Sequence, residues 1–383
     1  MSVTKALGFT AAGIAAGIKE NGNPDLGLVR NLGPDHTAAA VFTSNRVKAA
    51  PVLWSEQVIK DHKLQAVILN SGGANACTGP DGFADTHQTA ETVAAGLEIG
   101  AIDVAVCSTG LIGTRLPMNK ITEAVPTLIQ QATPEGGADA ARAIMTTDTH
   151  PKQAVAHGDG WVIGGMAKGA GMLAPGLATM LVVITTDAVI GADDLDSALR
   201  TATGATFDRL DSDGCMSTND TVIAMASGAS GVDVSWQPFT AALTTVCHEL
   251  AQQLLGDAEG ASHQISINVR GAASEQDAIT VGRTIARNNL FKCAVFGQDP
   301  NWGRVLAAIG TTDAIFEPDH LDVSFNKIKV CIGGSIGEPR ELVDLSGRAV
   351  EVEVDLHAGE HETTIWTNDL TYDYVKENAE YSS

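Results

Sequence analysis

Residues 168–185 constrain the fold of this chain more than any other segment. The sequence Lys-Gly-Ala-Gly-Met-Leu-Ala-Pro-Gly-Leu-Ala-Thr-Met-Leu occupies 168–181, and Val-Val-Ile-Thr follows at 182–185. The glycines and the proline favour an irregular backbone path, whereas the apolar run predicts a buried strand. The small Ala178 leaves its carbonyl uncrowded, and Thr179 stands at the mouth of the strand.

This arrangement predicts scission of the chain between Ala178 and Thr179. The Thr179 hydroxyl can attack the Ala178 carbonyl, and an N-to-O acyl shift followed by ester hydrolysis would free an N-terminal threonine. That residue carries nucleophile and base together, since a free α-amine has a pKa of roughly 7.7 to 8. The alternatives are an ordinary strand-opening threonine and a dinucleotide-binding loop at 169–174. Pro175 disfavours the loop, because a helix should follow it.

The composition indicates a compact α/β protein. The chain has 383 residues, of which 44% are apolar and 40 are glycine, and its formal net charge is −22. So acidic a surface disfavours nucleic acid or an anionic membrane as a partner. Six cysteines lie far apart without a CxxC pair, which is typical of reduced thiols in the cytosol. No apolar run approaches the length of a membrane span, so we expect a cytoplasmic protein.

Alternating strand and helix signals run along the whole chain. Strands are expected within 8–51, at 66–70, 102–107, 161–163, 182–185 and 265–269, and in the tail at 323–325, 328–332, 349–356 and 362–367. Helices are expected at 85–97, 120–131, 137–144, 194–203 and 276–287, and a long one carries the apolar stripe of Phe239 to Leu254. No linker interrupts the region of Thr179. The two fragments, 1–178 and 179–383, are therefore expected to fold together.

Three other motifs are weaker. Gly-Gly-Ser-Ile-Gly at 333–337 matches a nucleophile elbow, but Glu-Pro follows it where a helix is required. His357 to His361 matches a zinc pattern, yet it lies between two strand-like runs and is better explained by a hairpin turn. Asp211-Ser-Asp-Gly lacks the other ligands of a calcium loop. We therefore expect no metal, and no phosphate-binding loop is present.

Blocks throughout the chain resemble the ornithine acetyltransferases, which are also called glutamate N-acetyltransferases. Besides the segment around Thr179, the blocks lie at 40–51, 70–79, 108–113, 217–220, 257–260, 299–304 and 369–374. Two departures are Gly73, where many members carry asparagine, and Asn368, where a cysteine is expected. Neither falls on a position with an assigned role.

The resemblance implies a role for each matching residue. Thr179 resembles the nucleophile, and Thr109 with Gly110 resembles the oxyanion hole, where each donor contributes roughly 3 to 4 kcal/mol. Substrate-binding positions are implied at Thr146, Lys168, Thr179, Glu259, Asn378 and Ser383. Lys168 suits an α-carboxylate and Glu259 suits an ammonium group. Asn378 and Ser383 imply that the tail folds back over the pocket.

The resemblance also implies an activity and a fold. The activity is transfer of an acetyl group from N2-acetyl-L-ornithine to L-glutamate through an acetyl-Thr179 ester, with ping-pong kinetics, in the cyclic arginine pathway. The fold is a layered αββα sandwich of the self-cleaving DmpA and ornithine acetyltransferase type, with a smaller appended C-terminal lobe. Two copies of each fragment would assemble as α2β2. No cofactor is expected, although acetyl-CoA remains possible as a co-substrate.

Two alternative functions stay open at this point. The first keeps the nucleophile but makes water the acceptor, as in self-cleaving aminopeptidases. The second is an uncleaved, non-catalytic metabolite-binding protein that retains the fold. Release of N-terminal residues from peptides would favour the first, and a chain that stays whole would favour the second.

Overall fold

The computed structural model describes residues 3–174 and 180–380. These residues divide into two compact units. Among the described residues, unit 1 comprises 3–170, 180–208 and 216–257, and unit 2 comprises 171–174, 209–215 and 258–380. Each unit is described below within its own boundaries.

Unit 1 contains two sheets. The four-stranded sheet has the order β1-β2-β4-β5 and comprises β1 (Phe9–Ile14), β2 (Leu26–Asn31), β4 (Ala66–Asn70) and β5 (Val104–Ser108). The five-stranded sheet has the order β3-β9-β8-β7-β6 and comprises β3 (Thr37–Phe42), β9 (Thr221–Ala226), β8 (Leu181–Thr186), β7 (Val162–Lys168) and β6 (Lys152–His157). Apolar side chains from both sheets meet in one core cluster, which includes Val67, Leu69, Val183 and Ile223. The two sheets therefore face each other.

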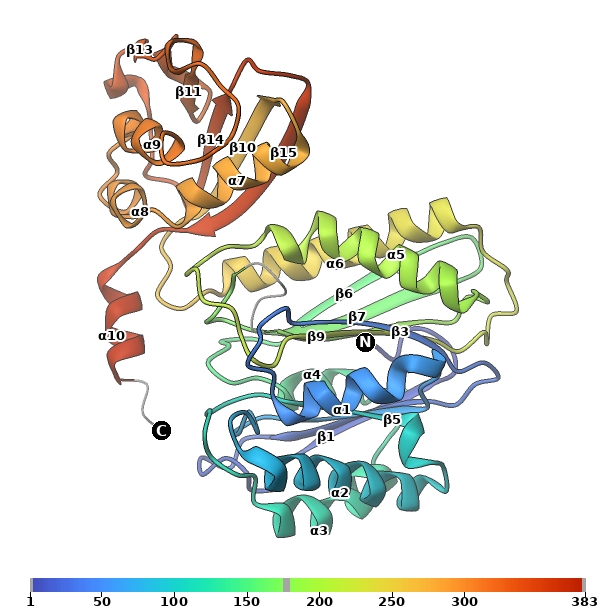
Figure 1. Cartoon of the computed structure of the whole chain (residues 1–383). Coiled ribbons are helices and arrows are strands. Elements are labelled where there is room, and N and C mark those ends of the chain that lie inside the picture. The colour runs from blue at the N-terminus through green and yellow to red at the C-terminus, as the bar shows by residue number, and fades with distance from the viewer. Residues whose placement is uncertain (1–2, 175–179, 381–383) are drawn as a thin grey trace. The chain divides into compact units, whose positions relative to one another are not determined.

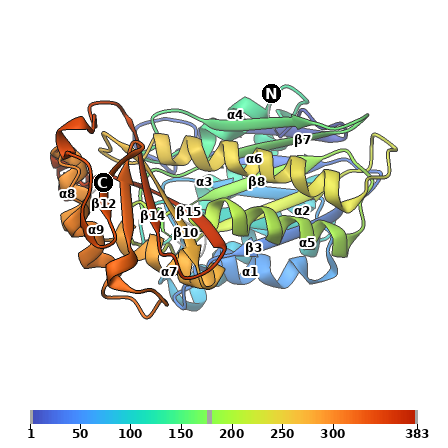
Figure 2. The same cartoon turned by 90° about the horizontal axis from the view of Figure 1, so that it is seen from above.

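Helices cover the outer faces of these sheets (Figure 1). On the four-stranded sheet, α2 (Gly79–Leu97) and α3 (Met118–Gln130) share a second cluster with the strand residues Leu28, Ile68 and Val106. On the five-stranded sheet, α5 (Ala192–Ala205) and α6 (Trp236–Gly256) lie side by side, as Figure 2 also shows. Two further helices, α1 (Ala50–Val58) and α4 (Gly137–Ala143), pack against β5 and β1 respectively. The αββα layering that the family resemblance implies is confirmed.

Strand β8 explains how the predicted scission point relates to the fold. All six of its residues are buried, as its apolar run predicts. It pairs antiparallel with β7 and parallel with β9. Strands from both sides of positions 178 and 179 thus belong to one hydrogen-bonded sheet. After scission there, both fragments would contribute strands to the same sheet and would stay hydrogen-bonded to each other through β7 and β8.

Unit 2 is the smaller lobe predicted at the C-terminal end. Its six-stranded sheet has the order β13-β12-β11-β14-β10-β15 and comprises β13 (Ser335–Ile336), β12 (Ile328–Ile332), β11 (Asp322–Phe325), β14 (Ala349–Asp355), β10 (Gln264–Ala272) and β15 (His361–Asn368). Its helices are α7 (Glu275–Ala286), α8 (Asn289–Phe296), α9 (Trp302–Ile309) and α10 (Tyr372–Glu380). The sheet and α7 to α9 share one apolar cluster. Unit 2 therefore has a core of its own.

The segments that matched other functional motifs do not adopt the conformations that those motifs require. The segment at 333–337 is an exposed hairpin built on β12 and β13, so it is no nucleophile elbow. His357 and His361 flank the turn between β14 and β15. No helix begins within 169–174. Among the described residues, no group of His, Cys, Asp or Glu side chains has the arrangement of a metal site. Within those residues, no helix combines the length and apolar composition needed to cross a membrane.

Candidate functional site

Thr109 lies where the two parallel strands of the four-stranded sheet end. Strands β4 and β5 are parallel, and Asn70 is the register partner of Ser108. The carboxyl ends of parallel strands gather functional groups at one sheet edge. Thr109 is the next residue, it is 2% exposed, and its carbonyl accepts from Gly73 N at 3.0 Å. The predicted oxyanion residue is thus a fixed part of the fold.

Side-chain amides lock this turn in place. Asn219 Nδ2 donates to Ser108 O at 2.8 Å and to Ala74 O at 2.6 Å. Ser108 Oγ donates to Asn70 Oδ1 at 2.6 Å. Asn219 is buried, so these bonds are protected from water. The role of Asn219 in fixing the Thr109 turn was not predicted, because Asn219 and Ser108 are 111 residues apart in the sequence and only the tertiary fold brings them together.

Lys168 and Thr109 lie together, as the predicted roles require. Lys168 ends β7, is 2% exposed, and its Nζ donates to Thr109 Oγ1 at 3.1 Å. The hydroxyl of Thr109 accepts this bond, so its own proton can be donated to another acceptor. A buried cation beside a hydroxyl donor suits a ligand oxygen that carries negative charge.

Thr146 belongs to the loop between α4 and β6. Its backbone N–H donates to Asp148 Oδ2 at 3.0 Å. The preceding carbonyl, Met145 O, accepts from Lys19 Nζ at 2.6 Å. Burial lowers the pKa of Lys19, and nearby Lys168 lowers it further, while Asp25 and Asp148 raise it. Thr109, Thr146 and Lys168 thus lie in a part of unit 1 that is rich in ammonium groups.

Asp220 is an unusual carboxyl group next to the predicted scission point. It is completely buried, and its Oδ1 accepts from the backbone N–H of Met180 at 3.0 Å. Burial raises its pKa well above the ordinary value, against the lowering effects of the Met180 hydrogen bond and Lys168. The carboxyl group thus fixes the backbone of Met180, the first described residue after the predicted scission point.

Glu259 and Asn378 form a second group, in unit 2. Asn378, on α10, donates from Nδ2 to Glu259 Oε2 at 3.0 Å. The tail helix α10 thus contacts the carboxylate of Glu259, a predicted substrate-binding residue. Gly171 leaves room for that carboxylate, because an added Cβ would lie 2.6 Å from Glu259 Oε2. A side chain at position 171 would displace the Glu259 carboxylate.

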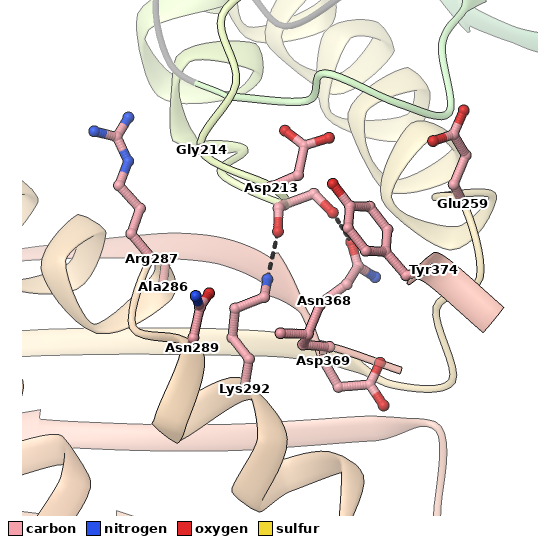
Figure 3. A pocket seen from close by; sticks show the side chains of 12 residues that line it. Asp213, Gly214, Glu259, Ala286, Arg287, Asn289, Lys292, Asn368, Asp369 and Tyr374 are labelled. Carbon is pink, nitrogen blue, oxygen red and sulfur yellow. Dashed lines mark hydrogen bonds between the residues drawn. The ribbon is translucent and has the colours of Figure 1, made fainter. Parts of the chain in front are cut away.

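Glu259 lines a cavity of about 300 Å³ in unit 2 (Figure 3). The cavity wall carries both charges, from Asp213 and Glu259 and from Arg287 and Lys292. Lys292 Nζ donates to Ser212 O and to Thr367 Oγ1, and burial lowers its pKa to about 8. Such a wall suits a small ligand that bears an ammonium and a carboxylate.

The electrostatics of the cavity wall follow from burial. Burial raises the pKa of Asp213, although backbone N–H groups of Cys215, Met172 and Leu173 lower it. Burial also raises the pKa of Tyr374 to about 12, and Asp213 and Glu259 add to that rise. Tyr374 is therefore a neutral hydrogen-bonding group at physiological pH.

Three of the predicted site residues lie outside the described residues. These are Ala178 and Thr179, at the predicted scission point, and Ser383. Among the described ones, unit 1 holds Thr109, Gly110, Thr146 and Lys168, and unit 2 holds Glu259 and Asn378. Their roles remain predictions.

Comparison with known proteins identifies close relatives. The sequence profile of the ArgJ family matches residues 10–383. The arginine biosynthesis bifunctional protein ArgJ of Streptomyces coelicolor is 64% identical over 383 residues, and that of Thermobifida fusca is 60% identical, each alignment covering 100% of both chains. A crystal structure of ornithine acetyltransferase complexed with ornithine, from Mycobacterium tuberculosis, is 60% identical over 47% of this chain and 96% of that chain, with a TM-score of 0.45.

Proposed function

The chain belongs to the ArgJ family, and from that membership we propose that it transfers an acetyl group from N2-acetyl-L-ornithine to L-glutamate in arginine biosynthesis. The observation that carries the proposal is the match over residues 10–383, together with relatives at 60–64% identity along their full length. No second function is favoured by a specific observation.

The first step is self-processing. The Thr179 hydroxyl attacks the Ala178 carbonyl, the peptide C–N bond breaks as the amine takes the proton, and water hydrolyses the resulting ester. The products are the fragments 1–178 and 179–383. The sheet shared by β7 and β8 supports the view that they stay together.

The transfer then runs in two halves. Thr179 Oγ attacks the acetyl carbonyl of N2-acetylornithine while the α-amine of Thr179 takes its proton, and the C–N bond breaks as that proton passes to the departing ornithine. The acetyl group is now an ester on Thr179. The amine of glutamate attacks this ester, and N-acetylglutamate leaves as the threonine regains its proton.

Thr109 and Gly110 stabilise the oxyanion in both halves. The proposal assigns the Thr109 hydroxyl and the Gly110 N–H as donors, each worth about 3 to 4 kcal/mol. The contact of Lys168 Nζ with Thr109 Oγ1 supports this role, because the ammonium strengthens the hydroxyl as a donor. Lys168 and Thr146 bind the substrate carboxylate, and Glu259, Asn378 and Ser383 complete the substrate contacts.

Several finer points belong to the same proposal. We expect the fragments to assemble as α2β2 in the cytoplasm. Acetyl-CoA can serve as a second acetyl donor, and no metal or bound cofactor takes part in either half of the reaction.

Initial-rate kinetics test the proposal. Double-reciprocal plots against N2-acetylornithine at several glutamate concentrations should give parallel lines, and Thr179→Ala should abolish both scission and turnover. Intersecting lines would reject the ester mechanism. Ornithine release that is equally fast without glutamate would indicate a hydrolase instead.

A further inference from the structure

A buried cluster of charges lies next to Thr146 and Lys168. Lys152 Nζ donates to Asp148 Oδ1 at 2.6 Å and to Asp257 Oδ2 at 2.5 Å. The side chains of Asp148 and Lys152 are completely buried. Asp257 also accepts from the backbone N–H and the hydroxyl of Thr149. Every member of the cluster has hydrogen-bond partners, as buried charges require.

Asp148 does more than pair with Lys152. Its Oδ1 also accepts from the backbone N–H of Gly169 at 2.7 Å, and its Oδ2 accepts from the backbone N–H of Thr146 at 3.0 Å. Gly169 directly follows Lys168. The Asp148 carboxylate therefore fixes the backbone amide of Thr146 and the peptide that follows Lys168, at two predicted substrate-binding residues.

Asp148 carries its negative charge at physiological pH. Burial raises its pKa, but the ammonium groups of Lys168 and Lys152, with the hydrogen bonds from Lys152 and Thr146, outweigh that effect and lower the pKa to about 2. The titratable groups near Lys168 include Asp148, Lys19 and Asp220, and Lys152 lies beside Asp148. Asp148 is the anion in this group that also orders the backbone.

We propose that Asp148 is a positioning residue for acetyl transfer, which holds Thr146 and the Lys168–Gly169 peptide in the arrangement that binds the substrate carboxylate. The inference rests on the proposed function. It assigns to Asp148 two backbone hydrogen bonds that matter for substrate binding, and to Lys152 only the neutralisation of Asp148 and Asp257.

The alternative is a buried ion pair that serves the fold alone. Removing either partner of such a pair leaves the other charge buried without a counter-charge and destabilises the protein. Under that alternative, changes at Asp148 and at Lys152 have the same consequences. Under the proposal they differ, because only Asp148 holds the two backbone amides.

The test compares Asp148→Asn with Lys152→Met. Lys152→Met leaves both backbone hydrogen bonds of Asp148 in place, whereas an asparagine at 148 has one acceptor oxygen and loses at least one of them. The double variant D148N/K152M removes both charges of the pair and guards against a failure of D148N to fold. Asp139→Asn, which replaces an exposed carboxylate on α4 that pairs with Arg142, is the control.

Kinetics are expressed per cleaved chain, with melting temperatures measured alongside. D148N and the double variant should raise KM for both substrates about tenfold, the loss of one charge-assisted hydrogen bond. K152M should lower the melting temperature but leave KM within about twofold of the wild type. Equal changes in KM for D148N and K152M, or a double variant with normal KM, would overturn the proposal.

Scission gives a second readout. If D148N fails to cleave while K152M cleaves, the positioning role extends to processing and the proposal stands. If neither cleaves, the cluster serves the fold and the proposal is wrong.

Amide hydrogen exchange separates this inference from the proposed function. D148N should speed exchange at Thr146 and Gly169, and K152M should not, whether or not the wild type transfers acetyl groups. A wild-type protein without transferase activity would contradict the proposed function. Unchanged amide exchange at Thr146 and Gly169 in D148N would contradict the positioning role of Asp148.

Discussion

Gly110→Ala probes the predicted oxyanion hole more directly than any other single change. Gly110 has φ +129°, a conformation that residues with a side chain rarely adopt. An added Cβ would lie 2.5 Å from Gly73 N and 2.7 Å from Gly72 C. Both are backbone atoms that cannot rotate away. Since Gly73 N donates to Thr109 O, the clash must shift the 109–110 peptide.

The size of the effect follows from this geometry. Losing one oxyanion donor costs about 10²- to 10³-fold in kcat. Overpacking against fixed backbone should cost about 1 to 3 kcal/mol of stability. Gly113→Ala is the matched control on the same loop, because Gly113 has φ +85° but no heavy atom within 4 Å of an added Cβ. It should cost about 1 kcal/mol through backbone strain and leave kcat within about threefold.

The assay is pre-steady-state acetylation of cleaved enzyme by N2-acetylornithine, with melting temperatures for both variants. G110A should acetylate at least about 100-fold more slowly than G113A. If both variants acetylate at similar rates, the 109–110 peptide does not stabilise the oxyanion, and the reasoning fails.

Three further predictions concern charge, thiols and the tail. The ionised form of Asp148 should contribute about 2 kcal/mol to the free energy of unfolding above pH 5, and this contribution should be lost as the pH falls from about 4 to about 2. In denaturant unfolding, the difference in free energy of unfolding between wild type and D148N should therefore narrow below pH 4. Iodoacetamide should alkylate the native protein only at its exposed cysteines, since burial raises the pKa of Cys107 to about 12, and mass spectrometry should find them at Cys77, Cys215 and Cys293. Asn378→Ala should raise KM for N2-acetylornithine about threefold at unchanged kcat, because the Glu259 contact is exposed to solvent; an unaltered KM would remove the tail from the site.

Periodicity predicted the long elements well and the short ones poorly. The stripe from Phe239 to Leu254 is α6, and the run at 182–185 is the buried strand β8. Strand β9 was missed, although all its residues are buried, because Ala and Met give a weak strand signal. Helix α2 begins at Gly79 rather than 85, since Pro80 in the first turn starts a helix despite its usual role as a breaker.

The site shows a similar limit. Family motifs led to Thr109 and Lys168, and the fold brings these two side chains together. Asp148 gave no signal of its own in a run of threonines, because its partners are set by tertiary contacts to Gly169 and, through Lys152, to Asp257. Residues that act by holding others are therefore found from the structure, whereas residues that resemble a known motif are found from the sequence.

Intact-mass spectrometry tests the central claim most directly. The purified protein would be weighed alone, after N2-acetylornithine, and after a chase with glutamate. The account predicts a fragment that begins at Thr179, gains one acetyl group from the donor and returns it to glutamate. A chain that stays whole, or a fragment that never gains the acetyl group, would contradict it.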